Sequence, residues 1–361
     1  MRNQSIDCVK ALAAILMVYG HLIFSGSYAD ASECVRNQIS FICSFHMPVF
    51  AVASGMFFST KRPVLNFVGH KSLQLFLPLF MWTSFSWFFY PIVSDLLLGY
   101  DIHLFATCRN VVYGLFVWQN YWFISSLYPC FLYGYIVKKI FKSDISLIGS
   151  VLILWIISWF EIIPNRLDTV CGMTFLYPFF VFGYFLHVYK SRFIVYRLPL
   201  AFISLAFYVV LILLFWRGLP DTWYVMNTGI FAEAHPVCGV TGIMVVWKTL
   251  SRFLIGASAS VFLLLSCEWL FDKIGSSDFQ SGKAVLSHLS DIGKYTLPVY
   301  LLSGRIQGFF EEWLGDSWYA NIIDTILIVY VCYFVAVITC KNKWLGLFLW
   351  GKTFQRKSIS H

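Results

Sequence analysis

Residues 5–24 read SIDCVKALAAILMVYGHLIF, an apolar run interrupted only by Asp7, Lys10 and His21. A run of about 20 apolar residues is long enough to cross the hydrocarbon core of a bilayer as a helix. Similar runs recur along the chain, which is 59% hydrophobic and 12% charged and has a mean hydropathy of +0.73. Soluble domains have about 45–50% apolar and about 25% charged residues. The composition therefore indicates an integral membrane protein without a sizeable soluble domain.

The apolar runs predict ten transmembrane helices. We expect an all-α polytopic membrane helix bundle that forms one integral-membrane domain over residues 1–361. Segment 225–248 contains Glu233, His235 and Pro236, and we expect it to be an outer loop with a re-entrant or amphipathic piece packed against protein. The predicted spans lie at about 8–26, 39–58, 73–98, 121–140, 145–163, 172–189, 199–216, 250–271, 295–314 and 320–340.

The distribution of basic residues orients this bundle. With a cytoplasmic N-terminus, 19 of the 26 lysines and arginines fall in inner segments, as the positive-inside rule requires. Both termini are therefore expected in the cytoplasm. The net charge of +8 is explained by topology, so we predict no nucleic-acid partner.

The ten cysteines show no C-x-x-C pair and no spacing typical of metal ligands, so no metal site is predicted. Most lie in predicted spans and are expected to be inert packing residues. An external disulfide stays open among the four cysteines of the outer segments, Cys34, Cys108, Cys171 and Cys238.

Lys10 and His21 are the sharpest functional candidates. Ten residues separate them, and on a helix this spacing returns to within about 20° of the same face after a rise of ~16 Å. A cation at the inner edge and an imidazole deep in the membrane suit an extended, anionic donor that enters from the cytoplasm. Lys10 as a snorkelling anchor and His21 as a hydrogen-bonding partner of another helix are the alternatives. For His21 we favour proton transfer, because imidazole titrates near neutral pH.

His46 opens the second span, directly before Met47-Pro48. The proline can kink the helix and free backbone carbonyls near the imidazole. A structural role and a role in the site both stay open for His46. Ser54-Gly55 follows in the same span and is expected to let another backbone approach closely.

The loop after the second span holds a basic cluster, Lys61, Arg62, His70 and Lys71. Such clusters usually set topology, but beside Lys10 this one also suits the phosphate groups of a ligand. Asp7 lies close before Lys10 in the sequence and is a further candidate for the site.

Two residues nearer the outer side complete the set of candidates. Trp122, at the start of the fourth span, suits either an interfacial belt or the apolar face of a sugar ring. Arg305 lies about ten residues into the ninth span and is expected to be an unpaired cation at depth, which makes it a functional candidate.

These residues carry a resemblance to a known family. The first block runs from Ser5-Ile6-Asp7 through Lys10 to Gly20-His21, and the second comprises Phe45-His46-Met47-Pro48-Val49-Phe50 and Ser54-Gly55. Together they resemble acyltransferase family three, the bacterial membrane O-acyltransferases of surface polysaccharides. Supporting matches are Tyr121-Trp122-Phe123, Phe180-Val181-Phe182-Gly183, Ile292-Gly293-Lys294-Tyr295-Thr296-Leu297 and Val299-Tyr300-Leu301-Leu302.

The resemblance implies ten helices with both termini inside, His21 as the catalytic histidine and Lys10 as a residue that helps to hold acyl-CoA. Two departures matter. Members often carry a histidine where this chain has Ser303, and paired arginines where it has Lys71 and Gln74. The grip on CoA is therefore expected to depend more on Lys10, Lys61 and Arg62, or to be weaker.

The expected function is that of a multi-pass O-acetyltransferase in the bacterial inner membrane. It would move an acetyl group from cytoplasmic acetyl-CoA to a sugar hydroxyl of a cell-surface or lipid-linked polysaccharide, among membrane lipids and without a metal. His21 would act as general base or carry the acetyl group. The alternative is a transporter or flippase of a glycan or lipid-linked precursor, which predicts repeated halves with broken helices. No such internal symmetry is visible in the sequence.

Overall fold

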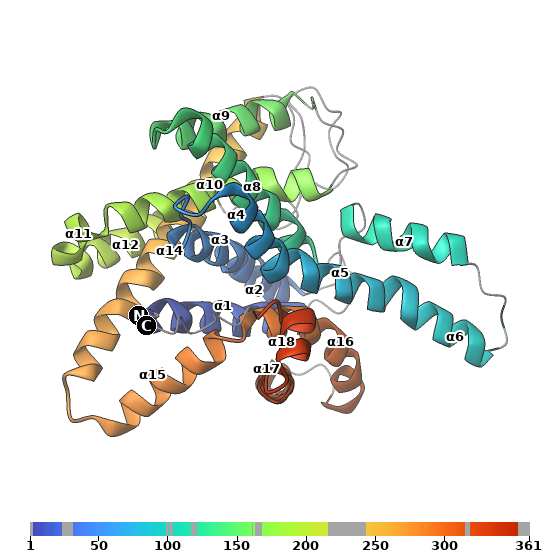
Figure 1. Ribbon diagram of the computed structural model, residues 1–361. Helices are drawn as coiled ribbons and strands as arrows, with labels where there is room; N and C mark the ends of the chain where they lie inside the picture. The colour runs from blue at the N-terminus through green and yellow to red at the C-terminus, as the bar shows by residue number, and fades with distance from the viewer. Residues whose placement is uncertain are drawn as a thin grey trace, which may run out of the picture.

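The computed structural model describes residues 3–23, 32–98, 100, 104–116, 121–160, 162, 168–215, 243–314 and 318–352. In these ranges all regular secondary structure is helical (Figure 1), which confirms the predicted all-α bundle. The α-helices are α1 (Gln4–Leu22), α2 (Glu33–Cys43), α3 (His46–Met56), α4 (Val64–Lys71), α5 (Leu77–Ser84), α6 (Tyr90–Leu98), α7 (Leu104–Phe116), α8 (Trp122–Phe141), α9 (Ile145–Trp159), α10 (Asp168–Val188), α11 (Lys190–Phe193), α12 (Arg197–Phe215), α14 (Ile243–Gly275), α15 (Gln280–Gly293), α16 (Thr296–Leu314), α17 (Trp318–Thr339) and α18 (Lys343–Trp350). Two π-helical turns, η1 (Ser72–Phe76) and η2 (Phe85–Phe89), and a 3-10 turn, η3 (Ile194–Tyr196), join some of them.

Seven helical stretches in the described part of the chain are long and apolar enough to cross a membrane, so this is a multi-pass membrane protein. They are Gln4–Leu22, Glu33–Met56, Val64–Leu98, Cys171–Val188, Arg197–Phe215, Ile243–Gly275 and Tyr319–Thr339. The other three predicted spans, 121–140, 145–163 and 295–314, overlap helices α8, α9 and α16. The count of ten spans and the cytoplasmic position of both termini stay predictions.

The structure adds helices that the apolar runs did not predict. Helices α7, α15 and α18 have 13, 14 and 8 residues, too few to span a bilayer. Only residues 243–248 of the doubtful segment 225–248 are described, and they form the beginning of α14. Glu233, His235, Pro236 and Cys238 lie outside the described residues.

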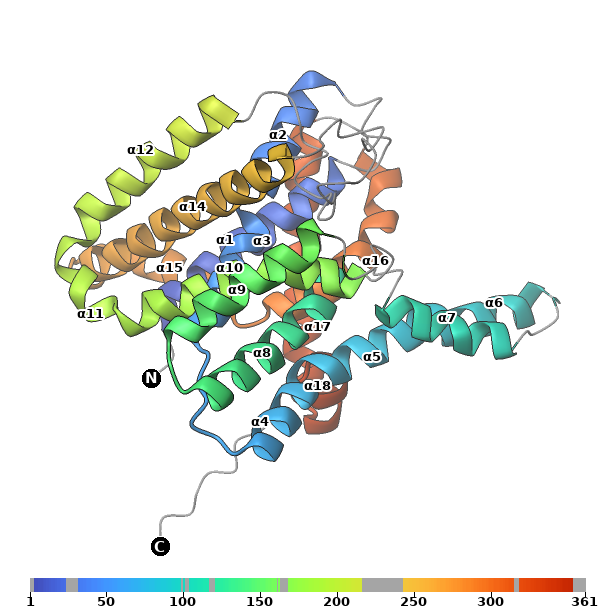
Figure 2. The same ribbon diagram turned by 90° about the horizontal axis from the view of Figure 1, so that it is seen from above.

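Two helical stretches exceed the thickness of a bilayer core. Residues 64–98 and helix α14 contain 35 and 33 residues, which correspond to ~52 Å and ~50 Å of helix against ~30 Å of hydrocarbon. Both views show α6 and α7 projecting as a helical hairpin from the body of the bundle (Figures 1 and 2). The end of α6 and the beginning of α7 are therefore remote from the helices that surround α1.

Helix α1 lies inside the bundle and contacts α3, α14, α15, α16 and α17. Helix α3 packs on α10 through two glycines. A Cβ atom at Gly55 would lie 1.8 Å from the carbonyl oxygen of Phe180, and one at Gly183 would lie 2.0 Å from that of Val52. This contact confirms the predicted close backbone approach at Gly55 and fixes α3 beside α1.

Candidate active site

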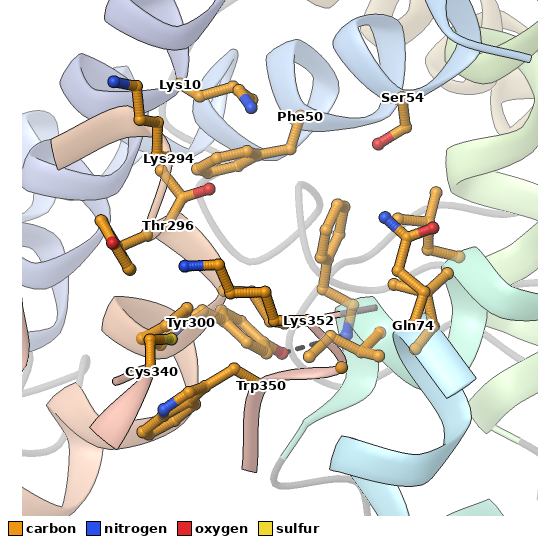
Figure 3. Close-up of a pocket in the computed structure, with 18 residues that line it drawn as sticks. Lys10, Phe50, Ser54, Gln74, Lys294, Thr296, Tyr300, Cys340, Trp350 and Lys352 are labelled. Atoms are coloured by element: carbon orange, nitrogen blue, oxygen red, sulfur yellow. Dashed lines mark hydrogen bonds between the residues drawn. The ribbon is translucent and has the colours of Figure 1, made fainter. Parts of the chain in front are cut away.

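A cavity of about 430 Å³ lies beside Lys10, in the N-terminal half of α1. Figure 3 shows its lining residues, which come from helices α1, α3, α8 and α16, from turn η1 and from the segment around α18. This volume lies within the range of pockets that hold small-molecule ligands. The wall combines lysines with aromatic rings, notably Lys10, Lys294, Lys352, Phe50, Tyr300 and Trp350.

Lys10 lines this cavity, as expected for a residue that holds the donor. Its ammonium lies 2.6 Å from a carboxylate oxygen of Asp7, and the Asp7 side chain is only 3% exposed. Helix α15 closes tightly over this pair, because a Cβ atom at Gly293 would lie 1.8 Å from the Asp7 carbonyl oxygen. Asp7 is thus a buried orienting partner of Lys10.

One face of α3 leads from the cavity toward the histidines. His46, Phe50 and Ser54 follow one another at intervals of four residues, which places them on the same side of the helix. Phe50 and Ser54 line the cavity, and His46 does not. A Cβ atom at Gly20, the residue before His21, would lie 3.5 Å from the side chain of Ile42, which precedes His46 by four residues. The structure therefore brings the two predicted histidines together, beyond the Phe50 end of the cavity.

The His46 ring has a defined orientation. It is 5% exposed, and its Nδ1 lies 2.8 Å from the carbonyl oxygen of Ile42. A carbonyl oxygen only accepts hydrogen bonds, so Nδ1 carries the hydrogen and Nε2 is the acceptor of the neutral ring. The partner belongs to α2, which ends at Cys43 before α3 begins at His46. The break in the second span thus supplies the carbonyl that holds the ring.

His21 lies in the last turn of α1 and its side chain is exposed. Its carbonyl oxygen accepts a hydrogen bond of 2.9 Å from Nε2 of Gln307 on α16. The other end of α16, at Thr296, lines the cavity. Thr296 and Gln307 on α16 are eleven residues apart, as are Lys10 and His21 on α1. Each spacing corresponds to a helical rise of ~16 Å, so the two helices run alongside each other from the cavity to His21.

The predicted basic cluster of the inner loop does not line the cavity. Lys71 Nζ lies 3.6 Å from the centre of the Phe131 ring and donates a hydrogen bond of 3.2 Å to Oε1 of Gln74. Lys61 and Arg62 are exposed before α4, and the Arg62 carbonyl oxygen accepts a hydrogen bond from the Tyr135 hydroxyl. The geometry brings Lys10 into the cavity and leaves these three cations outside it.

Trp122 and Arg305 also lie outside the cavity lining. The Trp122 ring packs 6.4 Å from that of Phe175, whereas the next residue, Phe123, lines the cavity and donates its backbone N–H to the Tyr300 hydroxyl at 3.1 Å. Arg305 is exposed and donates a hydrogen bond to the Ser86 hydroxyl in η2. This bond ties α16 to the helical stretch that leads to the projecting hairpin.

The cavity includes Gln74, where the sequence departs from the family pattern, and two residues that sequence reasoning did not single out, Lys352 and Trp350. In the sequence, Lys352 is one of the 19 basic residues that the charge distribution assigns to inner segments. A usable signal was present, because Gly351 follows an apolar run and a glycine in this place is typical of a helix C-cap.

The described residues offer no group of three or more His, Cys, Asp or Glu side chains that could hold a metal ion. Cys34 and Cys108, two of the four cysteines considered for a disulfide, are free thiols.

Comparison with known proteins adds to this geometry. A family model described as an acyltransferase domain, that of acyltransferase family three, matches residues 3–341. The nodulation protein NolL of Mesorhizobium japonicum is 25% identical over 198 residues, which cover 51% of this chain and 47% of that protein. The chain thus spans about half the length of this curated relative. No solved structure matches the chain.

Proposed function

The chain belongs to acyltransferase family three, and on this premise we propose that it moves an acetyl group from acetyl-CoA to a sugar hydroxyl of a cell-surface or lipid-linked polysaccharide. It is a multi-pass membrane acyltransferase, which favours this reaction over the transporter or flippase alternative. We place it in the bacterial inner membrane, with CoA bound from the cytoplasm and the sugar entering from outside.

One observation carries the proposal. Lys10 and Thr296 of the cavity wall each lie eleven residues before the level of His21, on α1 and α16 respectively, and His46 lies one turn before Phe50 on α3. CoA has phosphate groups at one end and a thioester at the end of a long pantetheine arm. A cationic cavity separated from a proton acceptor by ~16 Å of helix matches this shape: the phosphates stay near Lys10 and the thioester extends toward His21.

The chemistry required of His21 is proton transfer or transient acyl transfer. As general base, it takes the proton of the sugar hydroxyl while the oxygen attacks the thioester carbonyl. The carbon–sulfur bond then breaks, an ester bond forms, and the thiolate leaves with the proton that the imidazole returns. As acyl carrier, the His21 nitrogen attacks the thioester carbonyl, and the carbon–sulfur bond breaks to release CoA. The sugar hydroxyl then attacks the acyl-imidazole, the carbon–nitrogen bond breaks, and the imidazole takes the hydroxyl proton. His46 presents Nε2 as an acceptor and is the second candidate for the base.

The test is substitution of His21, read out by mass spectrometry of the surface glycan. His21→Gln keeps hydrogen-bonding capacity but cannot take a proton near neutral pH. If His21 is the base or acyl carrier, acetylation per folded molecule should fall by roughly 10²- to 10⁴-fold, while membrane insertion and protein abundance stay normal. Near-normal acetylation by His21→Gln would refute the assignment and direct attention to His46.

Donor and reaction class are checked in the same experiment. A glycan that loses one acetyl group per repeat when the protein is absent supports the proposed reaction. A glycan of unchanged acetylation that accumulates on the wrong side of the membrane would instead indicate the transporter.

A further inference from the structure

The third predicted span supplies little charge to the cavity. Gln74 lines the wall and is neutral. Lys71 lies near it, but its ammonium lies over the Phe131 ring. A ligand with several phosphate groups therefore needs cations from another part of the chain.

The C-terminal segment brings such a cation into the cavity. Helix α18 begins after Asn342, whose side chain accepts hydrogen bonds from the N–H groups of Trp344 and Leu345 at 2.9 and 3.2 Å. It ends at Gly351, which has a φ of 63°, a left-handed conformation that favours glycine. The N–H of Lys352 then donates to the carbonyl oxygen of Gly346 at 3.0 Å. The direction in which Lys352 leaves the helix is thus set by this turn.

Aromatic and backbone contacts hold α18 against the bundle. The indole N–H of Trp82 on α5 donates to the Leu349 carbonyl oxygen at 3.0 Å, and the Trp82 and Trp350 rings stack with centroids 5.5 Å apart. Trp350 donates its own indole N–H to the Thr339 hydroxyl at 2.8 Å. A Cβ atom at Gly351 would lie 2.1 Å from the carbonyl oxygen of Gln74. The segment is therefore a fixed wall of the cavity rather than a loose tail.

Lys352 differs from the other two lysines of the cavity. Lys10 is paired with Asp7, and Lys294 is paired with Asp291. In Figure 3 the Lys294 ammonium points away from the centre of the cavity, whereas the Lys352 side chain extends along the wall toward Thr296. Within the described ranges no carboxylate forms an ion pair with Lys352, whose ammonium lies 5.2 Å from the centre of the Tyr295 ring.

We propose that Lys352, held by the α18–Gly351 turn, binds the phosphate groups of the CoA donor opposite Lys10 and supplies the charge that the third span lacks. The inference rests on the proposed function, because it assumes a donor that carries phosphates. A Lys ammonium is a natural phosphate ligand. The arrangement makes the last helix of the described chain part of the donor site.

The test measures CoA binding by calorimetry to the full-length protein in nanodiscs. Lys352→Gln should weaken CoA binding by roughly 10- to 100-fold, the range of a lost charge-assisted hydrogen bond, and should leave binding of pantetheine, which has no phosphate, unchanged. Lys352→Arg should restore most of the affinity. Lys343→Gln is the matched control, since this exposed lysine of the same segment lies 5.3 Å from the Trp344 ring and does not line the cavity.

The outcomes separate the inference from the proposed function. Unchanged CoA affinity in Lys352→Gln overturns the inference, and the proposed function still stands if His21→Gln abolishes acetylation. Wild-type protein that does not bind CoA at all overturns both. Phosphate chemistry is shared by lipid headgroups, so the measurement is made in neutral and in anionic nanodiscs. An effect of Lys352→Gln that appears only with anionic lipid assigns the lysine to headgroups and overturns the inference.

Discussion

Substitution of Gly55 by alanine tests whether the α3–α10 contact holds α3 in place. The new methyl group would lie 1.8 Å from the Phe180 carbonyl oxygen, so the helices must separate by roughly 1.6 Å to reach the 3.4 Å of ordinary contact. Overpacking of a tight interface costs about 1–3 kcal/mol, and here the opposing atom is backbone that cannot rotate away. Alanine in a helix gains up to about 1 kcal/mol over glycine, so a net loss of stability remains.

The assay is thermal unfolding in detergent, followed by fluorescence-detected size exclusion. Gly149 on α9 provides a matched control, because a Cβ atom there meets nothing within 4 Å. Gly149→Ala should melt at or above the wild-type temperature, whereas Gly55→Ala should melt below it. Acetylation per folded molecule should also fall in Gly55→Ala, because α3 carries the Phe50 and Ser54 part of the cavity wall.

A second substitution in the same interface sharpens the result. Gly183 meets the Val52 carbonyl oxygen from the other helix, so Gly183→Ala should be destabilising by itself. Once the helices have separated, the second methyl group costs less, and the double variant should lose less than the two single losses together. A Gly55→Ala protein as stable and as active as Gly149→Ala would refute the reasoning.

Three further predictions follow from the described residues. A membrane-impermeant maleimide applied to intact cells should label the exposed native Cys34 and miss Gln280→Cys, and labelling at 280 would contradict the ten-span topology. Hydrogen bonds to the Asp144 carboxyl, above all the one from Lys138, lower its pKa. The ionised carboxyl therefore stabilises the fold at pH values above the ordinary carboxyl pKa of about 3.9. This stabilisation is lost as the pH falls through the lower pKa of the folded state. The melting temperature of Asp144→Asn should therefore lie below wild type at pH 7 and approach it below about pH 4. His46→Asn keeps a donor for the carbonyl one turn earlier but removes Nε2, so loss of acetylation in a folded variant would assign His46 to the site, and full activity would limit it to structure.

The sequence predicted what depends on local pattern. Apolar runs located most of the long helices, and helical periodicity placed Lys10 and His21 on one stripe of α1. Lys10 does line the cavity, and the roles of His21 and His46 stay predictions. The positions of the helices and the shared stripe of Lys10 and His21 depend on the sequence within single helices.

Tertiary packing determines which basic residues line the cavity, and the sequence did not predict this. Lys71 and Lys352 are both lysines of predicted inner segments, and the charge distribution does not separate their roles. The Phe131 ring accounts for the position of the Lys71 ammonium, and a glycine turn that contacts the Gln74 backbone brings Lys352 to the cavity. Helix α18, with 8 residues, is too short for a hydropathy argument to find.

The two π-turns, η1 and η2, have a consequence for the register of the long helical stretch over residues 64–98. A π-turn is an α-helical turn with one residue inserted, and one residue corresponds to a rotation of about 100°. Gln74 lies in η1 and lines the cavity, and Ser86 lies in η2 and accepts the hydrogen bond from Arg305. Each inserted residue turns every later side chain by about 100° around the helix axis. The same apolar stretch can therefore present Gln74 to the donor cavity and Ser86 to α16, although the two residues belong to differently phased faces. Deletion of one residue in either turn would leave the helix able to cross the membrane but would turn one of these side chains away from its partner.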